Sequence, residues 1–238
     1  MRKKSFWTVA VVLISLLMSS FLGAQEAENG TAEVFVGEPD AGETVREVVL
    51  ERAERVRYDS LKNIFEALGN VRAIQGQNLI ETQEMEYNLE TNTGVFRGGV
   101  VVTREATVIR SETMDGDFDA ELYLFQGGVE LTKERQEEEG TSTIFWKAQE
   151  ISFDGNTEEA WSEGAAEITW KEVNISAQRV HYFPADEGAG TLERMAFEGE
   201  VIITEQEREI LAERAVYYLA DEVLEAENII RARFIIED

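Results

Sequence analysis

The feature that most constrains the fold of this chain is an internal repeat of 29 residues. An aromatic residue or a glycine marks each unit, and successive marks lie 29, 29, 37, 29 and 35 residues apart. A fixed period is typical of proteins that stack one small unit repeatedly, so that neighbouring units bury a shared core. The six marks are Tyr58, Tyr87, Gly116, Phe153, Tyr182 and Tyr217.

The two longer intervals indicate insertions into a regular repeat. A second mark follows the first after thirteen residues, as in Val71, Val100 and Val129, and it localises eight extra residues near 133–140 and six near 184–191. Both segments are rich in Glu, Gly or Pro. We therefore expect two lengthened surface loops that leave the core unit intact.

Each unit contains two stretches in which apolar and polar residues alternate. Met85 and Tyr87, for example, alternate with Glu84 and Glu86. This period of two predicts β-strands with one buried face. Runs of Asn, Asp and Gly between the stretches predict hairpin turns, and glycines before the second stretch, such as Gly127, suit a bulge. We predict an all-β protein with at least twelve antiparallel strands.

The N-terminus predicts export. Arg2-Lys3-Lys4 precedes an uncharged apolar run from Ser5 to Leu22, and Gly23-Ala24 follows it. This order is that of a signal peptide cleaved after Ala24, which leaves a flexible segment over 25–43 and a folded part over 44–238. A retained membrane anchor is the alternative, because the apolar run is close to the minimum length of a spanning helix.

Charge and composition exclude several classes of function. The formal net charge of −26 makes nucleic acid a poor partner, since phosphate contacts require clustered Lys and Arg. The one basic concentration, Arg52, Arg55, Arg57, Lys62 and Arg72, is expected to balance Glu51 and Glu54. With no cysteine there is no disulfide and no thiolate metal site.

Nothing in the sequence predicts catalysis, a cofactor or a metal site. The single histidine, His181, lies on the outward face of a predicted strand and lacks a recurring Asp, Ser or metal-ligand partner. The short motifs of nucleotide-binding loops, serine hydrolases and zinc proteases are absent. We expect a protein without enzymatic activity.

The repeated unit resembles the OstA-like domain of LptA-type periplasmic lipopolysaccharide-transport proteins. The similarity rests on Ala53–Tyr58, followed after a hairpin by Gly69-Asn70-Val71, and on its recurrence at Glu84–Asn88 and Gly98-Gly99-Val100. It covers about residues 44 to 238 and all six units. The related domains of LptC and of the N-terminal part of LptD look similar.

The resemblance implies an elongated, slightly opened antiparallel β-jellyroll of six two-stranded repeats. In that family an apolar groove holds the acyl chains of lipopolysaccharide, and domains stack end to end between the inner and outer membranes. The implied partners are lipopolysaccharide or a similar lipid, LptC-like and LptD-like domains, and further copies of this chain. The implied compartment is the periplasm.

The apolar positions of the predicted inner face are our candidates for lining such a groove. A closed sandwich would use the same residues to fill its core, so a ligand-free structural scaffold stays an alternative, as does an LptC-like anchored component. A carbohydrate enzyme is a third alternative. The candidates are Val56, Tyr58, Val71, Ile80, Met85, Tyr87, Val100, Val102, Ile109, Val129, Leu131, Trp146, Ile151, Phe153, Ile168, Trp170, Val180, Tyr182, Val201 and Ile203.

Overall fold

The computed structural model describes residues 48–137, 140–186, 188, 190–206 and 208–234, where it forms one antiparallel β-sheet. The predicted signal peptide and the segment over 25–43 lie outside these residues. The sheet has 13 strands, which confirms the all-β prediction and the expectation of at least twelve antiparallel strands. The strands are β1 (Val48–Arg52), β2 (Arg55–Asp59), β3 (Ile64–Gln75), β4 (Asn78–Asn88), β5 (Thr93–Arg104), β6 (Thr107–Asp117), β7 (Leu122–Glu137), β8 (Gly140–Asp154), β9 (Ala160–Trp170), β10 (Val173–Phe183), β11 (Arg194–Glu205), β12 (Arg208–Tyr218) and β13 (Val223–Phe234).

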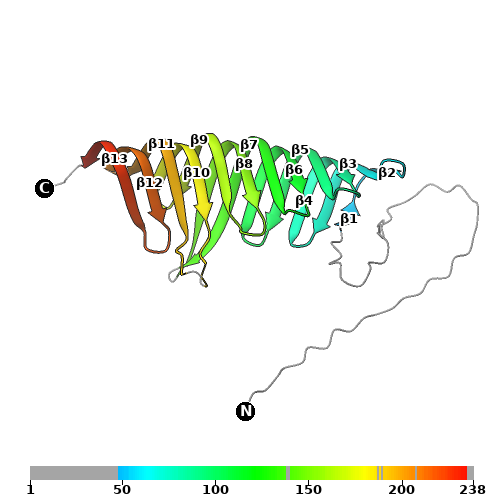
Figure 1. Cartoon of the computed structure of the whole chain (residues 1–238), viewed down its shortest axis with the longest axis horizontal. Coiled ribbons are helices and arrows are strands. Elements are labelled where there is room, and N and C mark those ends of the chain that lie inside the picture. Colours follow the sequence, from blue (N-terminus) through cyan, green and yellow to red (C-terminus); the bar gives the residue numbers. More distant parts are fainter. Residues whose placement is uncertain (1–47, 138–139, 187, 189, 207, 235–238) are drawn as a thin grey trace, which may run out of the picture. The chain divides into compact units, whose positions relative to one another are not determined.

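The sheet is a meander with two open edges. Each strand from β4 to β12 pairs with the strand before it and the strand after it, while β1 and β2 both pair with β3. Figure 1 shows the strands side by side in chain order, with β13 at one end and β1 and β2 at the other. The sheet therefore does not close into a barrel. Within the described residues there is also no helix long and apolar enough to span a membrane.

A row of bulges crosses the middle of the long strands. The pairing of β3 with β4 shifts between Leu68 and Val71, and the pairing of β5 with β6 shifts between Arg97 and Val100. Gly98 has a φ of 86°, in the left-handed region that glycine adopts without a Cβ penalty. The bulges confirm the predicted role of the glycines and divide the sheet into two parts.

We name the two parts by the connections at their outer ends. Half A contains the strand segments next to the β3–β4, β5–β6, β7–β8, β9–β10 and β11–β12 connections, and these connections form lip A. Half B contains the segments next to the β4–β5, β6–β7, β8–β9, β10–β11 and β12–β13 connections, which form lip B.

The inner faces of the two halves pack against each other. Asn78, in half A of β4, donates a 3.2 Å hydrogen bond to the hydroxyl of Tyr123, in half B of β7. Trp170 in half A of β9 and Tyr217 in half B of β12 have ring centroids 5.1 Å apart. Half A of one strand thus meets half B of a strand three positions later. The space between the halves holds the hydrophobic core.

One insertion differs from the sequence prediction. Residues 133–137 do not form a surface loop, because they continue β7 and pair with β8 as far as Glu137 with Gly140. The alternation of the repeat extends into the insertion and lengthens the hairpin. The insertion near 184–191 does lie between strands, with one isolated bridge between Asp186 and Thr191.

Candidate functional site

The predicted inner-face residues lie on one face of the sheet, and nearly all of them are buried. Val100, Val129 and Trp146 are each 1% exposed, and Ile151 is fully buried. Ile168, near the middle of the row, is 3% exposed. The two halves therefore close on each other, and the apolar residues between them are shielded from water.

Three candidates depart from full burial. Phe153 is partly buried at the edge of the core. Val56 and Tyr58 are 42% and 52% exposed, although they pair with Ala67 and Phe65 and so share the inner face. They lie in β2, at the end of the sheet. Half B of a strand is covered by half A of the strand three positions earlier, and among the described residues β2 has no such strand.

Packing between the halves leaves a cavity of about 60 Å³. Its floor is apolar and includes Leu131, Trp146 and Met195, while Lys133 and Glu158 lie among its polar lining. A second space of about 10 Å³ adjoins it and shares Arg104, Thr107 and Phe153 in its wall. The full lining of the larger cavity is Arg104, Glu105, Ala106, Thr107, Leu131, Lys133, Ile144, Trp146, Phe153, Glu158, Ala160, Tyr182 and Met195.

The core is also imperfect in its hydrogen bonding. The indole nitrogen of Trp146 is a buried donor with no acceptor among the described residues. An unsatisfied buried donor costs on the order of 1 to 3 kcal/mol. Trp170, by comparison, donates its indole N–H to the hydroxyl of Ser142 at 3.0 Å.

The mouth between the lips is closed lightly in the N-terminal part of the sheet. Besides the hydrogen bond from Asn78 to Tyr123, Arg104 donates to the carbonyl oxygen of Gly155 at 3.0 Å. The carboxylate of Glu121 lies 3.9 Å from the Arg104 guanidinium, at the outer limit of an ion pair. Each of these contacts reaches from lip A to lip B.

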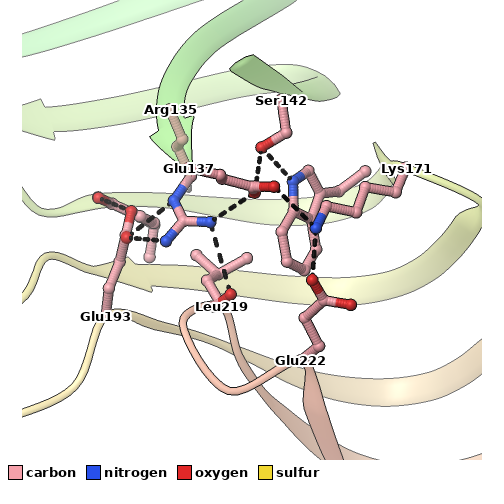
Figure 2. Close-up of polar contacts among 9 residues, drawn as sticks. Arg135, Glu137, Ser142, Lys171, Glu193, Leu219 and Glu222 are labelled. Atoms are coloured by element: carbon pink, nitrogen blue, oxygen red, sulfur yellow. Dashed lines mark hydrogen bonds and ion pairs between the residues drawn. The ribbon is translucent and has the colours of Figure 1, made fainter. Parts of the chain in front are cut away.

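The closure is denser in the C-terminal part, where Arg135 crosses the mouth (Figure 2). Its Nε and Nη2 lie 2.9 and 2.8 Å from one carboxylate oxygen of Glu193, and its Nη1 donates to the carbonyl oxygen of Leu219 at 3.5 Å. The hydroxyl of Tyr182 donates to the other oxygen of Glu193 at 2.7 Å. The Arg135 and Glu193 side chains are 13% and 14% exposed.

A second set of contacts extends this closure. Glu137 accepts a hydrogen bond from Ser142 at 2.5 Å and lies 2.9 Å from the ammonium of Lys171. Lys171 also pairs with Glu222 on lip B at 2.5 Å. Figure 2 shows these residues converging with Arg135 on one cluster. We call Arg135, Glu137, Ser142, Lys171, Glu193 and Glu222 the mouth cluster.

The contacts at the mouth shift the pKa values of Glu137, Lys171 and the neighbouring Tyr182. The hydrogen bond from Ser142 and the contact with Lys171 lower the pKa of Glu137. Hydrogen bonds to Glu222 and Glu137 raise the pKa of Lys171. Burial, followed by the neighbouring Glu193 carboxylate, raises the pKa of the Tyr182 phenol. The charged Glu137 carboxylate, the charged Lys171 ammonium and the neutral Tyr182 phenol are thus the stabilised forms.

No backbone-to-backbone hydrogen bond crosses the mouth within the described residues. The connections bond to neighbours on their own lip, as when Gly155 donates to Glu121 and Leu219 donates to Glu193. The contacts between lips use at least one side chain each. The two halves can therefore separate without breaking any strand pairing.

Polar residues outside the mouth are engaged on the surface. Arg72 pairs with Glu51 at 2.6 Å and with Glu81 at 3.3 Å, which agrees with the expected balance of charge in the first unit. His181 faces outward as predicted, but it has a partner, because its ring nitrogen lies 2.9 Å from Glu159. The described residues contain no group of three or more His, Cys, Asp or Glu arranged to hold a metal ion.

Sequence reasoning missed the residues that close the mouth. Arg135 and Glu137 lie in an insertion expected to form a loop, and Glu193 follows the other insertion. The alternation at Val129, Leu131, Lys133 and Arg135 was the available signal, since it places Arg135 on the inner face. The partner across the mouth carries no sequence signal.

Comparisons with known proteins find a similar solved structure but no family. No protein-family model matches the sequence, and no curated protein matches it. One solved structure that matches is LptH, the LptA-homologous periplasmic component of the lipopolysaccharide transport device of Pseudomonas aeruginosa. It is 12% identical, with a TM-score of 0.40, over 68% of this chain and 95% of the LptH chain.

Proposed function

We propose that this chain is a non-enzymatic lipid-transport protein that carries lipopolysaccharide, or a similar amphipathic lipid, between halves A and B. The observation that carries this proposal is an apolar inner face whose mouth, in the part of the chain that the structure describes, is closed by side-chain contacts and by no backbone-to-backbone hydrogen bond. A sandwich built only for stability has no need of two lips that can part.

The physical reason for such a path is the cost of exposing acyl chains to water. Each exposed methylene costs about 0.8 kcal/mol, so a lipid with several chains needs an apolar route across an aqueous compartment. Repeated units supply that route, since each hairpin adds further apolar residues to the inner face. The cavity beside Trp146 and Met195 is where the closed halves already leave room.

The two ends of the sheet support an end-to-end arrangement. β13 pairs with β12 on one side and with no other described strand, and its Ile229 and Phe234 are 57% and 58% exposed. At the other end, Val56 and Tyr58 are exposed on the inner face. Open edges of this kind accept a further strand. The proposed partners are other copies of this chain and the LptC-like and LptD-like domains of a transport bridge.

The proposed compartment is the periplasm. It follows from the predicted signal peptide, whose cleavage after Ala24 would leave a mature chain that begins at Gln25. A retained segment 1–24 would instead indicate an LptC-like component anchored in the inner membrane. The intact mass of the native protein distinguishes the two.

The competing function is a structural scaffold with a permanently closed core. The nearly complete burial of the inner face favours it, because residues such as Val201 and Phe197 are fully shielded from water. The two functions differ in whether an acyl chain ever replaces the contacts between the halves.

Quenching of tryptophan by a brominated lipid tests the proposal. Trp146 is 1% exposed and lies on the inner face. Trp161 lies on the outer face, because it is the cross-strand partner of the outward-facing His181. Two single-tryptophan proteins would be prepared, one retaining Trp146 and one retaining Trp161, with phenylalanine at the other tryptophan positions. Bromine quenches at short range only, so the label reports where the acyl chain lies.

We expect a brominated fatty acid, or lipopolysaccharide with brominated chains, to quench Trp146 and to leave Trp161 largely unchanged. Equal quenching of both would indicate adsorption to the surface. Quenching of neither would favour the closed scaffold.

A further inference from the structure

The closure of the mouth is uneven along the sheet. In the N-terminal part it includes the hydrogen bond from Asn78 to Tyr123 and the contacts of Arg104 with the Gly155 carbonyl and the Glu121 carboxylate. In the C-terminal part the mouth cluster brings two cations and three carboxylates together across the lips. The cluster, on the inner-face side of the long β7–β8 hairpin, is the feature that the proposed function leaves unexplained.

The Arg135–Glu193 pair favours an all-or-none opening. Both side chains are largely shielded from water, and a shielded ion pair is tolerated because each charge compensates the other. When the lips part, Arg135 keeps Glu137 at 3.4 Å and Glu193 keeps the Tyr182 hydroxyl, but the contact between Arg135 and Glu193 is lost before water can replace it. Intermediate widths of the mouth are therefore disfavoured.

The pair is coupled directly to the cavity. Tyr182 lines the cavity and donates a hydrogen bond from its hydroxyl to Glu193. Lys133 also lines the cavity, two residues before Arg135 on the same face of β7, and its ammonium lies 4.8 Å above the Tyr182 ring. A group that widens the cavity on the Tyr182 side displaces a hydrogen-bond partner of the pair.

The closed cavity is too small for a lipid chain. A buried water needs at least about 10 to 15 Å³ of such space, so about 60 Å³ holds only a few water-sized groups. An acyl chain of a membrane lipid is several times longer. Loading must therefore move the two halves apart at this point.

We propose that the Arg135–Glu193 pair is a latch on the mouth, and that an acyl chain enters between the halves only when Arg135 releases Glu193. The inference rests on the proposed function and names the contact that regulates it. The latch keeps the apolar face shut while no lipid is present, and the incoming chain opens it through Tyr182.

A reversible cross-link across the latch is the most direct test. The chain has no cysteine, so Arg135→Cys with Glu193→Cys introduces the only two thiols. A short bismaleimide with an internal disulfide would join the lips, and a reductant would release them. The matched control is Glu130→Cys with Lys147→Cys, an exposed ion pair at 2.9 Å between the outer faces of β7 and β8.

The probe is cis-parinaric acid, a fatty acid whose fluorescence rises in an apolar environment. We expect the cross-linked latch to take up the probe at least tenfold more slowly than the same protein after reduction, and the cross-linked control to bind as the wild type does. Uptake at equal rates before and after reduction would overturn the latch and leave the proposed function intact. Absence of binding in every protein, including the wild type, would overturn both.

A charge-neutral substitution provides a second test that needs no cross-link. Glu193→Gln keeps the shape of the side chain but removes its charge, so we expect probe association to become several-fold faster. Glu130→Gln is the control on the outer face and should leave the rate unchanged. Slower or unchanged association in Glu193→Gln, with native circular dichroism, would show that the pair only supports the fold.

Discussion

At the scale of single residues, Phe118 compensates for the one repeat unit that has no aromatic residue at its mark. The third unit carries Gly116 where the other units carry an aromatic residue, and Phe118 fills the vacated space from the following turn. Its ring lies 5.4 Å from that of Tyr87 and 5.6 Å from that of Tyr123. Repetition of the sequence predicts the aromatic row, but not that a neighbour two residues away completes it.

Phe118→Ala should lower the free energy of unfolding by about 3 to 5 kcal/mol, because Phe118 is 1% exposed and its removal leaves a large cavity. Urea denaturation measures the change. The control is Phe145→Ala, whose ring is 48% exposed on the outer face, and it should cost under about 1 kcal/mol. Equal losses in the two variants would contradict the packing described here.

Ionisation of Tyr217 should lower the free energy of unfolding at alkaline pH. Burial, and then the charge of Glu222, raises the pKa of Tyr217 to about 12, whereas an unfolded tyrosine ionises near 10. The unfolded state therefore loses its proton first as the pH rises. This residue should leave stability unchanged below about pH 10 and reduce it progressively from about pH 10 to about pH 12.

Unfolding measured across that range should show a shallower decline for Tyr217→Phe than for the wild type. The remaining decline is expected, since burial also raises the pKa of Tyr182 and Tyr87. Identical alkaline profiles of the two proteins would mean that Tyr217 is not the buried phenol described here.

At the scale of elements, the bulge row is what turns a flat meander into two facing halves. Its glycines differ in what surrounds them. Gly127 has a φ of 88°, and an added Cβ would lie 2.7 Å from the Cβ of Glu112. Gly164 has a φ of 91° but no atom within 4 Å of an added Cβ. The two positions separate backbone strain from steric contact.

Gly164→Ala should cost about 1 to 2 kcal/mol from the left-handed backbone alone. Gly127→Ala should cost at least about 1 kcal/mol more, because the Cβ of Glu112 belongs to a paired strand and has little freedom to move. Urea denaturation of both variants tests this order. A greater loss in Gly164→Ala would show that the bulges do not have the described geometry.

The sequence predicted the strands, their faces and the bulges, because alternation and glycine spacing are local signals. Val100, Ile109 and Ile168 lie buried as the alternation indicates. The mouth cluster was not predictable, since the meeting of Arg135 with Glu193 depends on how far the twist carries half A of one strand past the next strands. That offset is a property of the whole sheet and leaves no mark on either residue.

At the scale of the whole molecule, the exposed ends predict self-association. Ile229 lies in the edge strand β13, where lysine would oppose pairing of the outer edge with another strand. We expect Ile229→Lys to weaken concentration-dependent association in sedimentation velocity, and Phe145→Lys on the outer face to leave it unchanged. A wild-type protein that stays monomeric at high concentration would contradict end-to-end assembly of identical chains.

A lipid between the two halves of the sheet would lie within reach of a photoreactive group on the inner face. The most direct measurement places a photoreactive benzoylphenylalanine at Phe153, which borders both cavities, or at Phe145, which faces outward from the same strand β8. Cells that make lipopolysaccharide are irradiated, and the purified protein is probed for adducts. We expect an adduct at Phe153 and none at Phe145. Adducts at both positions, or at neither, would contradict a lipid path between the halves.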